Sequence, residues 1–178
     1  MKSKYTIRKV KIEDAEQYVR LNIFVWRNAY KNIFPESVFI EREKKIERNI
    51  QNFSKYQLEN PNGISYIAEI DGKIVGIMSG LYLSENTHFN ELGFADLKAL
   101  YVHPDFQHLG IGKALFDVFV EEIKKKGITK FVIGCLKENK LARKAYEKWG
   151  GTLDKYTQSF IQEGKGYPEV FYTYGLNK

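Results

Sequence analysis

Two glycines stand one residue apart in the stretch QHLGIGK, residues 107–113, between an apolar run and a segment whose apolar residues have helical spacing. Glycine adopts backbone conformations closed to other residues and lets a ligand approach the chain closely. The first N–H groups of a helix lack partners within it, and the helix dipole favours negative charge there. The spacing therefore predicts a loop that binds an anion at the start of a helix.

Two common phosphate-binding motifs do not fit this loop. A Rossmann fingerprint, GxGxxG, requires a third glycine where the chain has Leu115. A Walker A loop requires glycine at the position of Gln107 and serine or threonine at the position of Ala114. Both motifs are therefore excluded as the source of the glycine pair.

The loop instead resembles Q/R-x-x-G-x-G/A, the pyrophosphate-binding loop of the GNAT superfamily of N-acetyltransferases, with Gln107, Gly110 and Gly112 at its fixed positions. Taken alone, the glycine pair also fits an ordinary strand-to-helix turn. The flanking stretches LYVHPDF and ENKLARKAYEKWGG match the same superfamily. Because the order of expected elements agrees over nearly the whole chain, the resemblance implies a single N-acetyltransferase domain at residues 1–178.

The resemblance implies acetyl-CoA as cosubstrate, with its pyrophosphate on the loop and its pantetheine arm paired with the preceding strand, where the next strand splays away. The implied cofactor-binding residues are Leu100, Tyr101, Val102, Gln107, His108, Leu109, Gly110, Ile111, Gly112, Lys113, Asn139 and Tyr146. Arg143 and Lys144 either reach the 3′-phosphate or lie on a solvated helix face. No metal is expected, because His88, His103 and His108 lack metal-ligand spacing.

Two residues are candidates for the chemistry of transfer. Tyr146 matches the superfamily tyrosine that protonates the departing thiolate, although it also fits a core aromatic position. Asp96 is the candidate base for the acceptor amine, because alternation along the strand places it on the same side as Leu100 and Val102. A β-bulge between them would break this relation, and a solvated carboxylate or a water relay would also fit the sequence.

The resemblance implies that the acceptor is a primary amine on a small molecule or peptide. In the superfamily, Trp26, Tyr30 and Phe34 would border the acceptor groove, although an aromatic core explains them as well. Glu163 and Glu169, near the C-terminal end, are available for a cationic amine. Polyamines, amino sugars, amino acids and protein N-termini all remain open, and so does a non-catalytic acyl-CoA-binding or regulatory module of the same fold.

Periodicity and turn residues predict an alternation of strands and helices. Strands are expected at about 4–10, 64–70, 73–83, 94–103, 131–136, 152–161 and 169–176, and helices at about 12–30, 35–53, 111–126 and 139–149. We expect a tight hairpin at Asp71-Gly72 and a loop at residues 162–168 in the final hairpin. The fold class is thus α/β (α+β), a mixed and mostly antiparallel sheet with a central parallel βαβ crossover and helices on both faces.

Composition fits such an enzyme and argues against other classes. The 178 residues are 43% apolar, and the net charge of +6 is spread over mixed-sign stretches such as EREKKIER, which argues against a nucleic-acid footprint. The single Cys135 cannot form a disulfide within the chain, and no apolar run suffices to cross a membrane. These features, together with an N-terminus without a signal-peptide core, predict a soluble, cytoplasmic protein; a homodimer stays open.

Overall fold

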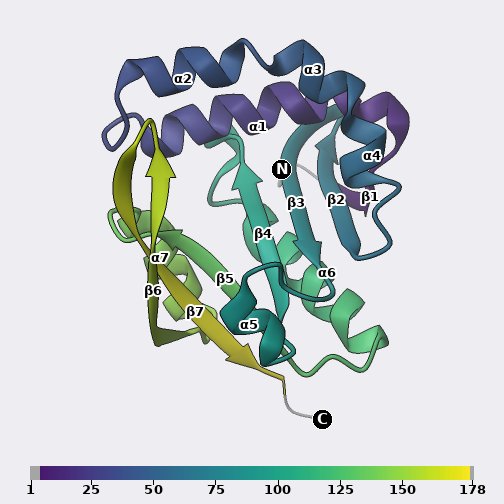
Figure 1. Ribbon diagram of the computed structural model, residues 1–178. Helices are drawn as coiled ribbons and strands as arrows, with labels where there is room; N and C mark the ends of the chain where they lie inside the picture. The colour runs from purple at the N-terminus through teal and green to yellow at the C-terminus, as the bar shows by residue number, and fades with distance from the viewer. Residues whose placement is uncertain (1–4, 177–178) are drawn as a thin grey trace.

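The computed structural model of the protein describes residues 5–176, which form one seven-stranded sheet in the order β1-β2-β3-β4-β5-β7-β6 (Figure 1). The ends of the expected domain, residues 1–4 and 177–178, lie outside the described residues, as does the start of the first expected strand. The strands are β1 (Thr6–Lys9), β2 (Gly63–Ile70), β3 (Lys73–Leu81), β4 (Ala95–Val102), β5 (Lys130–Leu136), β6 (Thr152–Gln162) and β7 (Lys165–Gly175). The α-helices are α1 (Ala15–Tyr30), α2 (Glu36–Glu43), α3 (Ile46–Gln51), α4 (Phe53–Gln57), α5 (Thr87–Glu91), α6 (Ile111–Lys125) and α7 (Lys140–Lys148).

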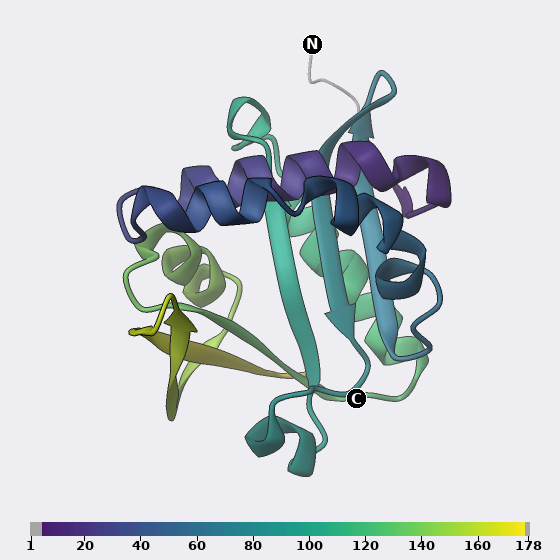
Figure 2. The ribbon, with the colours of Figure 1, turned by 45° about the horizontal axis from the view of Figure 1, so that its top comes forward.

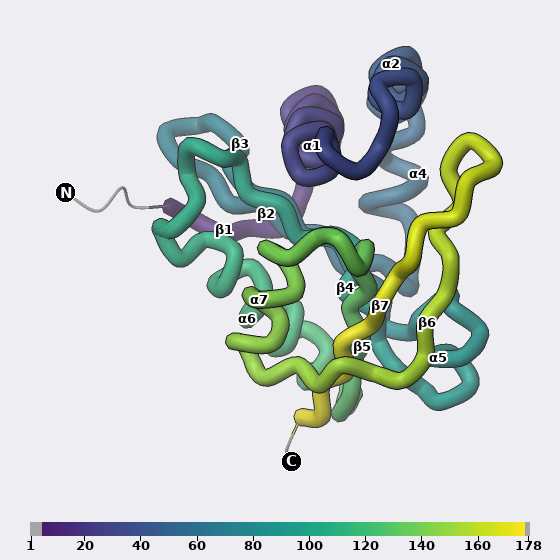
Figure 3. The backbone as a smooth tube through the Cα atoms, turned by 90° about the vertical axis from the view of Figure 1, so that its left-hand side faces the viewer, coloured from purple at the N-terminus to yellow at the C-terminus, as the bar shows by residue number. Residues whose placement is uncertain are grey.

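The predicted fold class is confirmed. Strands β4 and β5 pair in parallel through the crossover helix α6, and the remaining strand pairs described here are antiparallel. Helix α1 crosses one face of the sheet and α6 covers the other (Figures 2 and 3). Within residues 5–176, no helix has the length and apolar character that crossing a membrane requires.

Two hairpins turn on residue pairs with positive φ. Asp71 and Gly72, at φ 48° and 76°, join β2 to β3 as predicted. Glu163 and Gly164, at φ 50° and 74°, join β6 to β7. The expected loop over residues 162–168 is therefore wrong, because the tight turn lets both strands continue to their shared tip.

The helix expected at 35–53 is also wrong as a single element. The backbone leaves helical geometry at Lys45 and Asn52, where ψ is 0° and 5°, so the segment forms α2, α3 and α4 in succession. These short helices follow α1 across the sheet (Figure 1). A further helix, α5, begins in a segment expected to be irregular, where the Asn86 side chain caps it by accepting from the His88 N–H at 3.1 Å.

Strands β4 and β5 separate shortly after they meet. Their parallel pairing is limited to Ala95 with Phe131 and Asp96 with Val132, although each strand continues beyond these residues. Strand β5 remains paired with β7 throughout, and β4 with β3. The two strands therefore diverge while each is held by its other neighbour, as the resemblance implied.

A β-bulge lies in β4 at the point of separation. Ser79 of β3 faces Ala99, whereas the next residue, Gly80, faces Leu97, so Lys98 is the extra residue. Side chains before and after the bulge consequently exchange faces. Leu97 and Leu100 both contact the core beneath α6, although they are an odd number of residues apart.

Gly80 makes this arrangement possible, because a side chain there would meet its neighbours. A Cβ on Gly80 would lie 2.5 Å from Cε2 of Phe119 and 2.7 Å from the carbonyl oxygen of Asp96. We expect Gly80→Ala to lower the free energy of unfolding by about 1–3 kcal/mol. This corresponds to a melting temperature lower by roughly 2–12 °C.

Thermal melts and urea titrations measure this effect. Gly175→Ala is the matched control, since an added Cβ there meets no atom within 4 Å. Equal stability of the two variants would contradict the assigned packing around Gly80.

Candidate functional site

A cavity of about 780 Å³ lies where β4 and β5 separate. It is lined by the end of α1, the outer part of β4, the loop before α6, the end of β5 and one face of α7. All predicted cofactor-binding residues line this cavity except Leu109, whose side chain is exposed on the loop. The structure therefore gathers residues from five separate segments around one space.

The loop before α6 has the backbone geometry of an anion site. His108 and Gly110 have φ of 62° and 86°, and Gly110 is the N-cap of α6. The Ala114 N–H donates to the Gly110 carbonyl at 3.0 Å, so the N–H groups of Ile111 and Gly112 precede the first helical hydrogen bond. These groups are directed toward the helix N-terminus, where the dipole favours an anion.

A side chain at Gly112 would not clash with the rest of the protein. A Cβ on Gly112 would meet Trp149 and Val102 at 3.7 Å, an ordinary contact distance. The fold therefore has room for a methyl group at this position, so packing within the protein does not require glycine here. Nearby, the side-chain amide of Gln107 donates to the Val102 carbonyl at 3.3 Å and ties the loop to the end of β4.

Tyr146 lines the cavity from α7. Its ring packs near Tyr172, with centroids 5.9 Å apart, and burial raises the pKa of its hydroxyl well above the ordinary value. The hydroxyl is therefore protonated at neutral pH. Asn139 caps α7 by accepting from the Ala142 N–H at 3.1 Å and also lies beside the Tyr30 hydroxyl, so its capping and cavity-lining positions coincide.

Asp96 is not among the residues that line the cavity. The bulge at Lys98 turns its side chain away from the face that carries Leu100 and Val102, so the expected alternation does not hold. Its carboxylate accepts from the Ser84 hydroxyl at 2.8 Å. Burial raises the pKa of Asp96, and the negative charge of Glu169 adds to this increase.

Glu169 lies against β5 at the separation of the strands. Its Oε1 would be 3.0 Å from a Cβ on Gly134, a residue that lines the cavity. The Gln158 amide donates to its other carboxylate oxygen at 2.6 Å. Glu163, the other acidic residue considered for a cationic amine, instead accepts from the Ser37 hydroxyl at 2.8 Å at the hairpin tip.

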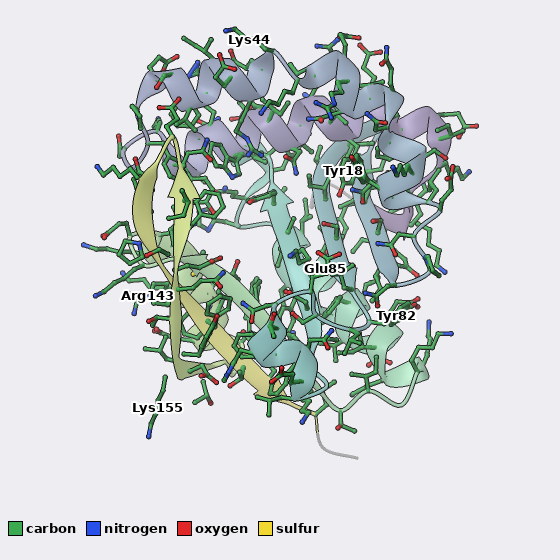
Figure 4. All side chains as sticks on the ribbon, viewed as in Figure 1. Tyr18, Lys44, Tyr82, Glu85, Arg143 and Lys155 are labelled. Carbon is green, nitrogen blue, oxygen red and sulfur yellow. The ribbon has the colours of Figure 1, made fainter. Side chains whose placement is uncertain are left out.

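The aromatic residues at the end of α1 serve both the core and the cavity. Trp26 and Phe34 stack with centroids 5.0 Å apart and are buried with Tyr30 in one cluster. Tyr30 also lines the cavity, whereas the other two do not. Arg143 donates to the Tyr172 hydroxyl at 3.0 Å and lies beside the β6–β7 hairpin (Figure 4).

Sequence reasoning missed several residues that line the cavity, among them Lys98, Cys135 and Trp149. Cys135 lies on β5 past its last pair with β4, so only the separation of the strands exposes it to the cavity. The sequence did contain a signal for Trp149, because it follows Tyr146 at helical spacing and is therefore expected on the same face of the helix. Within residues 5–176, no cluster of three or more His, Cys, Asp or Glu could hold a metal.

Comparison with known proteins places this site in a family. Residues 24–151 match the acetyltransferase (GNAT) family, and the chain belongs to it. The family transfers acetyl groups from acetyl-CoA, and the protein is accordingly an acetyl-CoA-dependent N-acetyltransferase.

The individual relatives share less than a third of their aligned residues with this chain. The chain is 28% identical to a spermidine N(1)-acetyltransferase of Thermoplasma acidophilum, over 89% of this chain and 96% of the relative. It is 27% identical to an uncharacterised N-acetyltransferase of Methanocaldococcus jannaschii, over 82% of this chain but only 60% of that protein. Its fold is similar to that of the PaiA N-acetyltransferase of Thermoplasma acidophilum in complex with coenzyme A, with a TM-score of 0.72, 22% identity and coverage of 93% and 98% of the two chains.

The loop assignment predicts that a negative side chain at Gly112 prevents coenzyme A binding. We expect Gly112→Glu to weaken the dissociation constant by more than about 100-fold, because the carboxylate would face the pyrophosphate at close range. Isothermal titration calorimetry measures the affinity, and a thermal melt confirms that the variant is folded. Gly112→Ala is the control for folding, since the methyl group has room; a folded Gly112→Glu variant that binds like the parent would contradict the assignment.

Proposed function

We propose that the protein transfers the acetyl group of acetyl-CoA directly to a primary amine while both substrates are bound. The observation that carries this proposal is the position of Tyr146, whose buried, protonated hydroxyl lines the same cavity as the anion-binding loop. Acetyl-CoA supplies the acetyl thioester. The loop binds its pyrophosphate, the free edge of β4 binds its extended arm, and Tyr146 protonates the sulfur as the carbon–sulfur bond breaks.

The geometry supports direct attack over an acetylated cysteine. Cys135 lines the cavity and is the only thiol of the chain. Burial raises the pKa of Cys135 to about 12, so its reactive thiolate is scarce at neutral pH. A covalent intermediate on this residue would therefore lack the nucleophile that it needs.

Two carboxylates share the face of the sheet on which the amine would be deprotonated. Asp96 stays our proposed base, since its raised pKa brings it closer to neutral pH than an ordinary aspartate. Because Asp96 does not line the cavity, the proton reaches it through a bridging water. Glu169, nearer the cavity through Gly134, would attract the positively charged amine before it loses its proton.

One relative suggests a class of acceptor. The 28% identity to a spermidine N(1)-acetyltransferase makes a polyamine one candidate acceptor. The rival function is a module that binds acetyl-CoA without turnover. Release of coenzyme A thiol that requires an amine separates the two, because the rival binds coenzyme A and releases no thiol. A cytoplasmic location and a homodimer stay predictions.

Removal of the Tyr146 hydroxyl tests its role as acid. We expect Tyr146→Phe to lower kcat by about 10- to 100-fold, the lower part of the range for general acid catalysis, because a thiolate is a fair leaving group. Since the pKa of Tyr146 is raised well above its ordinary value, the loss should be the same throughout about pH 6 to 10. Steady-state thiol release measures both rates.

Cys135→Ala is the control in the same cavity and should retain most of the turnover. If Tyr146→Phe matched the parent across this pH range, solvent would be the proton donor and Tyr146 a core aromatic. Loss of turnover in Cys135→Ala, with parallel initial-velocity lines for the parent, would instead support a covalent route.

The carboxylate assignment predicts the acidic side of the pH–rate profile. A base must be deprotonated to act, so activity should rise through the raised pKa of Asp96, and Asp96→Asn should remove this rise and lower kcat by about 10²- to 10⁴-fold. Glu169→Gln removes a charge that raises the pKa of Asp96, so the rise should move to lower pH. A rise that persists in Asp96→Asn and disappears in Glu169→Gln would make Glu169 the base.

A further inference from the structure

Arg42 of α2 is a half-buried cation, and within residues 5–176 no carboxylate forms an ion pair with it. Its Nε is buried and has no hydrogen-bond acceptor. Other cations take the carboxylates of the same helix: Arg27 pairs with Glu36 at 2.5 Å and with Glu43 at 3.1 Å, and Lys44 pairs with Glu41 at 2.6 Å. Leaving the buried Nε–H donor without an acceptor costs free energy, so this unsatisfied donor requires an explanation.

The fold holds the Arg42 guanidinium in a fixed position by stacking. Its Cζ lies 3.9 Å from the ring centroid of Trp26. This cation–π contact contributes attraction, but it leaves the N–H donors at the edge of the planar group unused. Such an edge fits two coplanar oxygens of a carboxylate through a pair of parallel hydrogen bonds.

The stacked guanidinium is close to the cavity. Trp26 neighbours Tyr30 in the aromatic cluster, with ring centroids 5.0 Å apart, and both Tyr30 and Tyr101 line the cavity. The side chains of Tyr101 and Tyr30 also influence the pKa of Arg42, which burial lowers. Arg42 itself is not among the residues that line the cavity; it lies next to tyrosines that are, where the carboxylate of an acceptor extending past Tyr30 and Tyr101 would meet it.

Charges of opposite sign flank Tyr30. The negative charge of Glu169 is close enough to contribute to the raised pKa of Tyr30, whose main cause is burial. Arg42 brings positive charge to the same residue from α2. An acceptor that carries an ammonium and a carboxylate complements this arrangement, whereas a polyamine complements only the acidic side.

We propose that Arg42 binds a carboxylate of the acceptor, so that the enzyme acetylates amines that carry a carboxylate, such as amino acids, short peptides or ω-amino acids. This inference rests on the proposed transfer to an amine and specifies its substrate class. Arg42 makes no bond to the reacting atoms, so its role is to determine specificity.

The test compares acceptors that differ only in the carboxylate. Dipeptides and ω-amino acids, each with its C-terminal amide as counterpart, are assayed for thiol release with acetyl-CoA, alongside spermidine and aminoalkyl phosphonates. The enzyme variants are the parent, Arg42→Gln, Arg42→Lys and Lys44→Gln. Lys44→Gln is the matched control, because Lys44 is an exposed cation at the C-terminal end of the same helix (Figure 4).

We expect at least one carboxylate acceptor to exceed its amide in kcat/KM by about tenfold or more in the parent. Arg42→Gln should lower kcat/KM for this acceptor by about 10- to 100-fold, the range for lost hydrogen bonds to a charged group, and change the amide less than about twofold. For the carboxylate acceptor, kcat/KM of Arg42→Lys should lie between the values of the parent and of Arg42→Gln, because lysine keeps the positive charge but lacks the planar pair of N–H donors. Lys44→Gln should match the parent, and thermal melts should show all variants folded.

Other outcomes distinguish a wrong role for Arg42 from a wrong transfer reaction. A parent that prefers spermidine, amides or phosphonates, or an Arg42→Gln variant that loses activity equally toward carboxylates and amides, would overturn the role of Arg42. If no amine released thiol although coenzyme A bound, the transfer reaction would be wrong. Calorimetry on the coenzyme A complex would then test the role of Arg42 by measuring the binding of the carboxylate acceptors. If the parent binds them and Arg42→Gln does not, the carboxylate site is supported. If the parent does not bind them, the proposed site is wrong.

Discussion

The separation of β4 from β5 is the constraint on which the site depends. Buried backbone N–H and C=O groups require partners, so a sheet normally closes such a gap. Here β5 is bonded to β7 along its length and β4 to β3, which leaves each strand stable with one free edge. The free edges face a cavity large enough for a ligand whose amides can take the place of the missing strand. The bulge opposite Gly80 fixes where the separation begins.

Burial determines the chemistry of the side chains around that cavity. It raises the pKa of Tyr146 and of Cys135, so both groups are neutral at physiological pH, one as a proton donor and the other as an unreactive thiol. The proposed anion site combines the backbone N–H groups and the dipole at the start of α6 with three lysines that line the cavity, Lys98, Lys113 and Lys148. Such local positive charge does not require a large net charge, and the net charge of the chain is only +6.

Local signals in the sequence were sufficient where the physics is local. Gly110 indicated the loop and Asp71-Gly72 the hairpin, because only certain residues adopt positive φ easily. Gly112 added to the first signal because glycine allows close approach to the backbone. The bulge at Lys98 left no comparable signal, since it depends on how Gly80 packs against Phe119 on another element. The alternation that assigned Asp96 to the side of Leu100 failed for this reason.

Packing between distant segments also explains why the positions of Arg42 and of the final hairpin were not predicted. Nothing in the stretch EREKKIER distinguishes Arg42 from its charged neighbours; it is half-buried because α2 folds back so that its side chain stacks on Trp26. The tight turn at Glu163-Gly164 had a glycine as a cue, yet the tip of its hairpin is positioned by contacts with a segment more than a hundred residues earlier, such as Ser37 with Glu163.

The β6–β7 hairpin has a consequence for how this enzyme could diverge in evolution. Its residues, 152–175, follow the segment that matches the family, residues 24–151, and the aromatic Tyr167 meets Phe34 at a centroid distance of 4.6 Å beside the start of α2. Insertions or substitutions at the tip of this hairpin would change the side of the cavity where we propose that the acceptor binds. They would leave the loop before α6, β4 and α7 unaltered. Selection can therefore change which amine is acetylated while the inherited means of holding the acetyl donor stays intact.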